Sequence, residues 1–323
     1  MAWCWALAAQ AEALRIATFH TELQRKGPGL FLRDLSRGAK DIDFVLERMA
    51  KVDADIWVLQ GIDYDAEGLA LDLLARKVGL KYAFALPPNT GVATGLDLDG
   101  DGRTGGPRDA QGFGWFSGQG GIAVLSRYPV SLEADRSADL WADLDWAPMP
   151  QLDGAAFYSE KAAEVLRLSN TGHWALRVSA PGGQITLITA YATTPVFDGP
   201  EDRNGLRNAN ELRLAARMME ATEGPTVIAG NFNLDPQAGE GRREVMAKFL
   251  ARPDLHDPLP GEPTVDFGAS SAGKLRVSYV LPSAELSVLD AGVATAERPT
   301  SSGDVRFTRH HPVWVDLELQ GGS

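Results

Sequence analysis

The sequence predicts an α/β protein in which two β-sheets pack face to face with helices on the outside. The chain has 323 residues, of which 44% are hydrophobic, with 34 glycines and 19 prolines, and this is typical of a folded, loop-rich globular protein. Short apolar runs predict buried strands, and apolar residues at every third or fourth position predict helices between them. Because no repeat or linker divides the sequence, we expect one domain over residues 12–323.

The predicted elements follow one another along the chain. Buried strands are predicted at residues 14–19, 55–60, 122–125, 226–230, 275–281 and 312–319. Residues 174–178 and 185–191 predict two paired strands, because the turn Pro181-Gly182-Gly183 separates them. Helical spacing is found at residues 42–51, 69–78 and 208–219. Residues 87–121 have no periodicity and are rich in Gly, Asp and Pro, which predicts a long functional loop.

The N-terminal residues 1–11 predict the remnant of a secretory signal peptide. They are apolar, too short to span a bilayer, and end in Ala9-Gln10-Ala11, which is similar to a cleavage site. Cleavage there would remove Cys4, the one cysteine, and would place the mature protein outside the cell or in the periplasm. The alternative is the frayed N-terminus of a cytosolic protein. No other segment is long and apolar enough to predict a membrane span.

The net charge of -12 restricts the class of partner. Proteins that bind long nucleic acids gain most of their affinity when Lys and Arg neutralise phosphates. The acidic chain therefore disfavours long DNA or RNA as a partner, and a monomer is expected.

A series of ordered segments resembles the endonuclease/exonuclease/phosphatase superfamily. They are Leu14–Phe19, Asp55–Gln60, Gly121–Pro129, Leu187–Phe197, Ile228–Asn233, Arg276–Pro282 and His310–Asp316. Residues 97–103 and 193–204 resemble a bacterial secreted branch. The resemblance implies a DNase I-like, four-layer α/β/β/α sandwich of two mixed sheets. It also implies phosphoester hydrolysis with a divalent metal, Mg or Mn, held by carboxylates at the strand ends.

Three positions of the family site are compatible with that chemistry. They are Tyr191 at the middle motif, Asn233 in Gly230-Asn231-Phe232-Asn233, and His310 in the last motif. Five positions differ from the residues that the family motifs imply: His20, Gly61, Asn231, Ser278 and Arg309. Gly61 stands where the resemblance implies the principal metal-binding Glu. Asn231 stands where the resemblance implies an Asp that acts as the general base, and an amide cannot accept a proton at neutral pH.

These exchanges predict that family-type hydrolysis is weak or lost while anion binding is retained. Arg309, His310, His20 and Asn233 would bind a phosphorylated or anionic small molecule, with His311 beside them. One alternative is an active metal-dependent phosphoesterase with a rebuilt site that uses His20, His310, His311 and the Asp198–Asp202 loop. Another is a calcium-stabilised extracellular binding protein.

The predicted calcium site lies in loop 97–109. Asp97, Asp99 and Asp101 have the D-x-D-x-D-G spacing that places three carboxylates around one Ca²⁺. The twelfth loop position carries Arg108 instead of Glu, and Asp109 follows. The alternative is a solvated acidic turn.

Several other polar and aromatic residues are expected to have structural roles. We expect Arg207 and Arg213 to be surface charges and His173, His256 and His311 to be structural histidines. Packing is the commoner fate of tryptophans near loops, here Trp115, Trp141, Trp146 and Trp174.

Overall fold

A computed structural model describes residues 13–269, 271–300 and 305–319 of the chain. The signal-peptide prediction at residues 1–11 lies outside the described residues, so export stays a prediction. The helices are α1 (Leu30–Arg37), α2 (Lys40–Val52), α3 (Leu69–Val78), α4 (Glu160–Ala163), α5 (Arg203–Glu220) and α6 (Arg243–Leu250), with a 3-10 turn at Trp141–Asp143.

Two large mixed sheets form the centre of the fold. The first has the order β14 (Ser287–Val293), β15 (Val313–Glu318), β1 (Ala13–His20), β2 (Ile56–Ile62), β4 (Gly121–Ser126) and β3 (Tyr82–Phe84). The second has the order β13 (Ser278–Pro282), β10 (Thr226–Asn231), β9 (Gly183–Tyr191), β8 (His173–Ala180) and β5 (Val130–Asp135). Two small ribbons are β6 (Gln151–Leu152) with β7 (Ala155–Ala156) and β11 (Val265–Asp266) with β12 (Lys274–Leu275). Strand β1 is parallel to β2, and β9 is parallel to β10.

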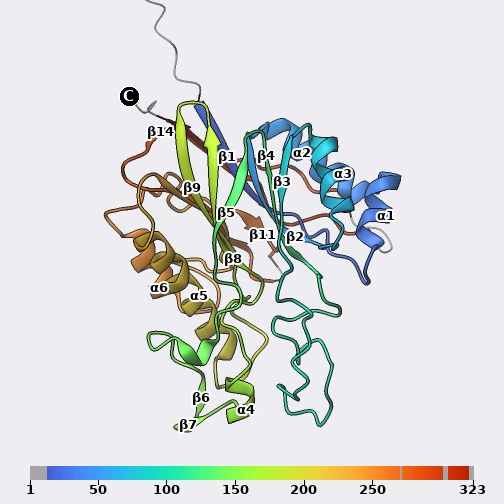
Figure 1. The fold of residues 1–323 in the computed structure, drawn as a ribbon, viewed down its shortest axis with the longest axis vertical. Coiled ribbons are helices and arrows are strands. Elements are labelled where there is room, and N and C mark those ends of the chain that lie inside the picture. Colours follow the sequence, from blue (N-terminus) through green and yellow to red (C-terminus); the bar gives the residue numbers. More distant parts are fainter. Residues whose placement is uncertain (1–12, 270, 301–304, 320–323) are drawn as a thin grey trace, which may run out of the picture.

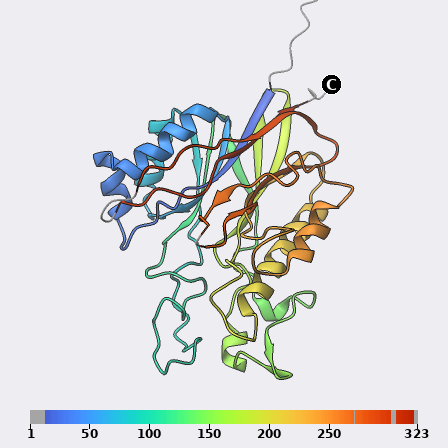
Figure 2. The same ribbon diagram turned by 180° about the vertical axis from the view of Figure 1, so that it is seen from behind.

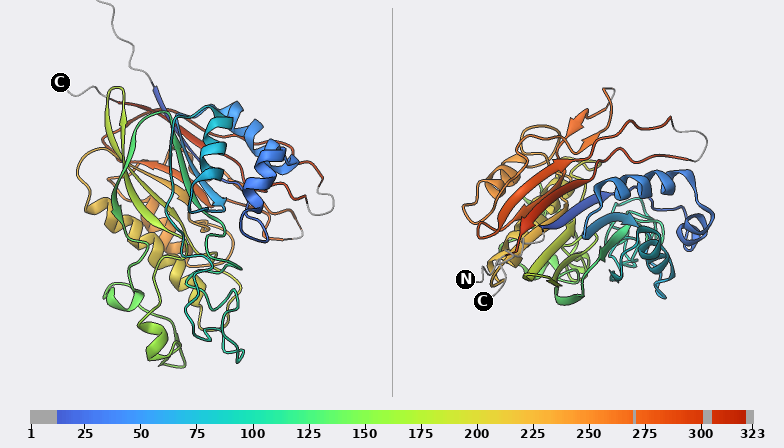
Figure 3. Two further views of the ribbon diagram at one scale, coloured as in Figure 1. Left: turned by 45° about the vertical axis from the view of Figure 1, so that its right-hand side comes forward. Right: turned by 90° about the horizontal axis from the view of Figure 1, so that it is seen from above.

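The sheets and helices form four layers, which confirms the predicted fold class. Apolar side chains from both sheets form one buried cluster between them, for example Ile16, Val58, Leu187 and Val280. Helices α1, α2 and α3 cover the outer face of the first sheet, and α5 and α6 cover the second (Figures 1 and 3). Each central strand is therefore covered on both faces, which explains its nearly continuous apolar sequence.

Strand β1 shows how the sequence produces this arrangement. Leu14 and Ile16 belong to the cluster between the sheets, whereas Ala17 and Phe19 belong to the cluster beneath the helices. Successive side chains of a strand point to opposite faces, so alternate residues supply two different cores. The strand then ends at His20, which places a polar side chain at the edge of both cores.

Two irregular segments extend beyond the same end of the sheets. One contains residues 87–120, and the other leads through β6, β7 and α4 toward β8 (Figures 1 and 2). The predicted long loop is confirmed, since the structure assigns no named helix or strand between β3 and β4. These segments lie beyond the strand ends that carry the candidate site residues, and they supply the walls of a cavity described below.

The structure also contains elements that the sequence patterns did not predict. These are the helices α1, α4 and α6 and the strands β3, β5, β6, β7, β11 and β14. The strand predicted at residues 275–281 is split, because Leu275 ends β12 and Ser278 begins β13. Trp141 and Trp174 are buried as expected, whereas Trp115 is 70% exposed. No helix among the described residues is long and apolar enough to cross a membrane.

Candidate functional site

Four of the residues singled out by sequence meet where strands of both sheets end. His20 ends β1, Tyr191 ends β9 and Asn231 ends β10, and His310 lies just before β15. His20 Nδ1 lies 2.9 Å from His310 Nε2 and 3.1 Å from Asn231 Nδ2. Its Nε2 lies 3.0 Å from the Tyr191 hydroxyl. These four residues are therefore joined by hydrogen bonds to His20, and together they form the His20 cluster.

The hydrogen bonds around Asn231 assign the proton positions in this cluster. The backbone N–H of Asn233 donates to Asn231 Oδ1 at 2.9 Å, so Asn231 Nδ2 is the donor to His20 Nδ1. His20 then carries its proton on Nε2, and His310 Nε2–H donates to His20 Nδ1. His310 Nδ1 is buried and has no hydrogen-bond partner among the described residues. The cluster is held together by bonds among its own members.

Burial keeps both imidazoles of this cluster neutral. Desolvation lowers the pKa of His20 to about 4, and it lowers the pKa of His310 well below its ordinary value. Desolvation also raises the pKa of the Tyr191 phenol. None of these groups therefore carries the charge that would attract an anion at neutral pH.

Arg309 forms an ion pair with a carboxylate that the sequence interpretation overlooked. Its Nη2 lies 2.6 Å from Glu22 Oε1, and its backbone N–H donates to Glu22 Oε2 at 2.8 Å. Burial alone would raise the pKa of Glu22, but the hydrogen bonds and the positive charge of Arg309 hold it below its ordinary value. Glu22 therefore balances the charge of Arg309, which the sequence analysis expected to bind an anion.

Gly61 occupies a backbone position that does not accommodate a larger residue. Its φ is +75°, and the pairing of β2 with β4 shifts register between Gln60 and Ile62. A Cβ there would lie 2.9 Å from Gln24 Oε1, 3.1 Å from Glu22 N and 3.2 Å from His20 Cδ2. The two acids that follow Gly61 in the sequence, Asp63 and Asp65, are bonded elsewhere. Asp63 accepts N–H bonds from Arg25 and Gly120, and Asp65 accepts them from the first turn of α3.

The other predicted site residues have local partners. Asn233 has φ +51° and donates from Nδ2 to the Ala192 carbonyl at 2.8 Å. Ser278 is buried, and its Oγ has no hydrogen-bond partner among the described residues. His311 Nδ1 lies 3.0 Å from Arg48 Nη2, and desolvation lowers its pKa to about 4. His311 is therefore paired with Arg48 and is not a member of the His20 cluster.

The polar side chains of the Asp198–Asp202 loop, which the rebuilt-site alternative would use, bond to neighbouring parts of the chain. Asp198 Oδ2 accepts the Asn204 N–H at 2.6 Å, and Asn204 Nδ2 donates to the Val196 carbonyl. Asp202 pairs with Arg242 and has φ +48°. Carboxylates that accept such bonds stabilise a loop. These contacts indicate that the side chains stabilise the turns of this segment rather than serve as metal ligands.

A group of carboxylates with metal-binding geometry lies in the long loop. Asp97, Asp99 and Asp109 each offer an oxygen, and these oxygens lie within 4.8 Å of one another. No other group of three or more His, Cys, Asp or Glu side chains with this geometry is found in the part of the chain that the structure describes. The predicted set is corrected in one member, since Asp109 stands in place of Asp101. Asp101 Oδ1 accepts the Arg103 N–H, and Asp97 and Asp109 also accept backbone N–H bonds within the loop.

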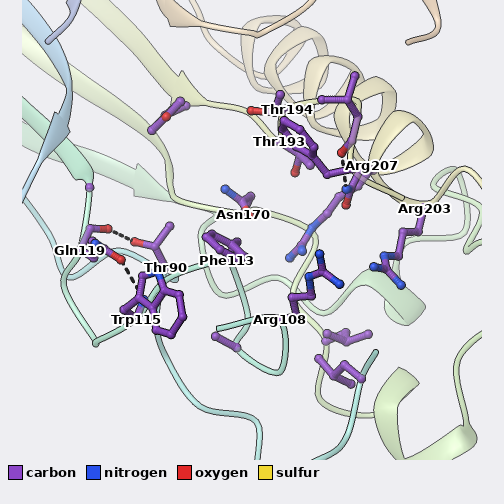
Figure 4. Close-up of a pocket in the computed structure, with 18 of the residues that line it drawn as sticks. Thr90, Arg108, Phe113, Trp115, Gln119, Asn170, Thr193, Thr194, Arg203 and Arg207 are labelled. Atoms are coloured by element: carbon purple, nitrogen blue, oxygen red, sulfur yellow. Dashed lines mark hydrogen bonds between the residues drawn. The ribbon is translucent and has the colours of Figure 1, made fainter. Parts of the chain in front are cut away.

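A cavity of about 630 Å³ opens beside the His20 cluster, with Tyr191 and Gln24 in its wall. Figure 4 shows the part of the wall that carries Arg108, Arg203 and Arg207. It is lined by the long loop, by residues 158–170, by the end of β9 and by the start of α5. Sequence reasoning missed this feature because it treated Arg207 as a surface charge. Arg207 instead donates to the carbonyls of Leu168, Gln111 and Arg167, and its side chain lines the cavity.

Comparisons with known proteins agree with this architecture. Residues 25–310 match the model of the Endonuclease/Exonuclease/phosphatase family. An endonuclease/exonuclease/phosphatase from Beutenbergia cavernae has a TM-score of 0.61 at 17% identity, with 95% of this chain and 72% of that chain covered. A family protein from Bacteroides thetaiotaomicron has a TM-score of 0.55 at 14% identity, covering 95% and 98%. A 3' phosphatase from Neisseria, NExo, bound to product DNA hairpin, has a TM-score of 0.52 at 16% identity, covering 94% and 99%.

The fold, the ordered strand ends and the match over residues 25–310 define a phosphoesterase-type α/β/β/α sandwich. The chain belongs to the Endonuclease/Exonuclease/phosphatase family. A comparison with curated proteins finds no match. Enzymes of this family generally use divalent metals, and the described part of the chain contains one acidic cluster of metal-binding geometry, at Asp97, Asp99 and Asp109.

Proposed function

We propose that this chain is a family member that has lost metal-dependent hydrolysis and binds a phosphorylated or anionic small molecule. The main support is Gly61. The principal metal-binding carboxylate of the family is absent there, and a side chain at this position would be strained by its positive φ and crowded by Gln24, Glu22 and His20. A divalent metal such as Mg²⁺ needs hard oxygen ligands. The side chains that meet at this point are two neutral imidazoles, an amide and a phenol, and the carboxylate beside them, Glu22, is paired with Arg309. This set does not fit that ion.

The closed hydrogen bonding of the cluster supports the same proposal. A general base must accept a proton from water, and Asn231 has no basic group at neutral pH. Both nitrogens of His20 are already bonded to protein partners. The residues of the His20 cluster hold the strand ends in position relative to one another. One of them, Tyr191, also lines the cavity.

We expect no turnover of phosphodiesters or phosphomonoesters above the level of a disabled variant. The full chain is assayed with bis-p-nitrophenyl phosphate, p-nitrophenyl phosphate and duplex DNA in Mg²⁺ and in Mn²⁺. Wild type, Tyr191→Phe and His310→Ala should give equal rates. Thermal unfolding of each variant checks that it is folded. Wild-type turnover at least tenfold above that of both variants would instead support an active, rebuilt site.

We also propose that loop 97–109 binds Ca²⁺ through Asp97, Asp99 and Asp109. The convergence of their oxygens favours this role, and Asp109 is only 3% exposed. Ca²⁺ takes six to eight oxygen ligands, so carbonyls and waters would complete the shell. The ion would stabilise a long loop that lacks helices and strands.

Calcium should raise the melting temperature of the wild-type chain by about 5 °C at an excess of ~100-fold over its dissociation constant. Asp99→Asn should remove this shift, because it removes one charged ligand with little change in shape. Asp101→Asn should retain the shift, since Asp109 and not Asp101 belongs to the cluster. Loss of the shift in Asp101→Asn would favour the ligand set predicted from the sequence. Absence of any shift in the wild type would reject the site.

A further inference from the structure

We infer that the cavity beside the His20 cluster binds a small anion that carries a flat aromatic ring. This inference rests on the proposed function, because it gives the location and the chemical class of the anion that the chain would bind. It places the ligand away from Arg309 and His310, which the sequence had favoured. The charge of the cavity wall, its exposed aromatic rings and the cavity volume together match such a ligand.

The cavity wall is cationic although the protein as a whole is acidic. The chain has 43 acidic and 31 basic residues, yet the lining includes Arg108, Arg203 and Arg207 and, among the described residues, no Asp or Glu. The side chains of these three arginines point toward the same part of the cavity (Figure 4). A positive field confined to one concavity attracts anions locally while the rest of the surface repels them.

The carboxylates near the arginines leave part of this charge unbalanced. Arg203 Nη1 lies 3.4 Å from Glu201, and Arg108 Nη1 lies 4.0 Å from Asp99. Arg207 forms no ion pair within 4.0 Å among the described residues, and its Nε and Nη2 donate to backbone carbonyls.

The carboxyl group whose charge acts on Arg207 belongs to Glu211, and this group is only partly ionised. Desolvation raises the pKa of Glu211 to about 7, so a fraction of this carboxyl is neutral at neutral pH. Arg207 is thus a half-buried cation that protein bonds hold in the cavity wall, where its fixed position suits recognition of an oxyanion.

Exposed aromatic rings gather around the same cavity. Among the described residues, the large exposed aromatics are Phe113, Trp115 and Phe197, which are 58%, 70% and 81% exposed, and all three line it. Leaving such rings in water is unfavourable, and a flat ring that stacks on one of them removes apolar area from water. Phe113 and Trp115 lie across the cavity from Arg203 (Figure 4). A ligand with a ring at one end and an anionic group at the other matches this division.

Further polar groups and the size of the cavity are consistent with such a ligand. Asn170 and Thr194 add polar groups to the cavity lining. The volume of about 630 Å³ lies within the range of small-molecule sites. Tyr191 joins the cavity to the His20 cluster, so the cavity lies beside the family's reaction centre.

The inference is tested by isothermal titration of the full chain with four probes. The buffer contains Ca²⁺ and no other divalent metal, because the loop of the proposed calcium site carries Leu98 and Arg108 of the cavity wall. AMP and phenylphosphonate carry both a ring and an anion, adenosine carries only the ring, and inorganic phosphate carries only the anion. We expect AMP or phenylphosphonate to bind at least tenfold more tightly than adenosine and inorganic phosphate. Failure of both ring-bearing anions to bind more tightly than inorganic phosphate would overturn the inference.

Variants locate the binding. Arg108→Gln should weaken the tighter ring-bearing probe at least tenfold, and it should fold normally because the Arg108 side chain is largely exposed. Trp115→Leu should weaken that probe but not inorganic phosphate. Arg76→Gln, on the exposed side of α3, is the matched control and should change nothing.

The experiment separates this inference from the proposed function. If Arg309→Gln weakens the ring-bearing probe and Arg108→Gln does not, the anion lies at the strand ends, and the location inferred here is wrong while anion binding stands. If the chain hydrolyses phosphoesters but still loses binding in Arg108→Gln, the loss of hydrolysis is wrong and the cavity assignment stands.

Discussion

Acidification from pH 7.5 to pH 4 should remove about 3 kcal/mol of folding free energy through His20 alone. Desolvation lowers its pKa from 6.5 to about 4 in the folded chain, and one pKa unit corresponds to about 1.4 kcal/mol. The unfolded chain binds the proton more strongly, so the contribution is fully present above pH 6.5. It is lost as the pH falls toward 4. His20 is 7% exposed, so solvent screening reduces this effect only slightly.

This effect must be isolated from groups that titrate in the opposite direction. Desolvation raises the pKa of Asp63 to about 6 and that of Glu211 to about 7. Their contribution to the free energy of unfolding increases as the pH falls through these values, because the folded chain binds their protons more strongly. The pH dependence of the wild type alone therefore combines gains and losses.

Comparison with His20→Gln removes this ambiguity. Urea unfolding is measured at half-unit intervals of pH for wild type, His20→Gln and Arg76→Gln. The difference in the free energy of unfolding between wild type and His20→Gln should fall by about 3 kcal/mol from pH 7.5 to pH 4. The difference for Arg76→Gln should stay constant. If the difference in the free energy of unfolding between wild type and His20→Gln were constant over this pH range, the His20 imidazole of the wild type would be solvated in the folded chain.

The fold was predictable because its central strands leave a strong signal in the sequence. Strands β1, β2 and β10 are covered on both faces, so β2 and β10 contain continuous apolar runs, and Arg15 and Thr18 alone interrupt the run in β1. Strand β5, with the sequence VSLEAD, is mostly exposed at the edge of its sheet and gives no such run. Helix α1 has only eight residues, which is too short for a clear periodic pattern.

The candidate site was predictable only where it is built from strand ends. His20, Tyr191 and Asn231 follow recognisable apolar runs, and the structure brings them within hydrogen-bond distance of one another or of a shared partner. Glu22 lies two residues beyond its strand and has φ +51°, a backbone geometry that no sequence period indicates. Its pairing with Arg309, which is 287 residues away, depends on tertiary structure.

The arginine-lined cavity was missed for a different physical reason. Helical spacing places Arg207 on the polar side of α5, but spacing does not reveal what covers that side. The cover is the irregular loop that carries Arg108 and Phe113, and its path is held by bonds such as Gln111 N–H to the Val92 carbonyl. A loop without periodicity can be recognised as functional by its length, but its side chains cannot be positioned from sequence.

Gly61→Glu should lower the stability of the chain and fail to restore metal-dependent hydrolysis. A non-glycine residue at φ +75° is strained, and crowding by Glu22 and His20 adds to the strain, for a total of roughly 2–5 kcal/mol. The restored carboxylate would still face neutral His20 and the amide of Asn231. Urea unfolding and the p-nitrophenyl phosphate assay in Mg²⁺ measure the two effects.

Gly79 provides the control that separates backbone strain from crowding at Gly61. Its φ is also +75°, but a Cβ there would meet nothing within 4 Å. Gly61→Ala should therefore destabilise the chain more than Gly79→Ala does, and the difference measures the space that Gln24, Glu22 and His20 occupy. Equal losses in the two alanine variants would show that this space can open. Gly61→Glu, alone or with Asn231→Asp, could instead gain Mg²⁺-dependent turnover. The loss of hydrolysis would then follow from the missing carboxylates rather than from the shape of the site.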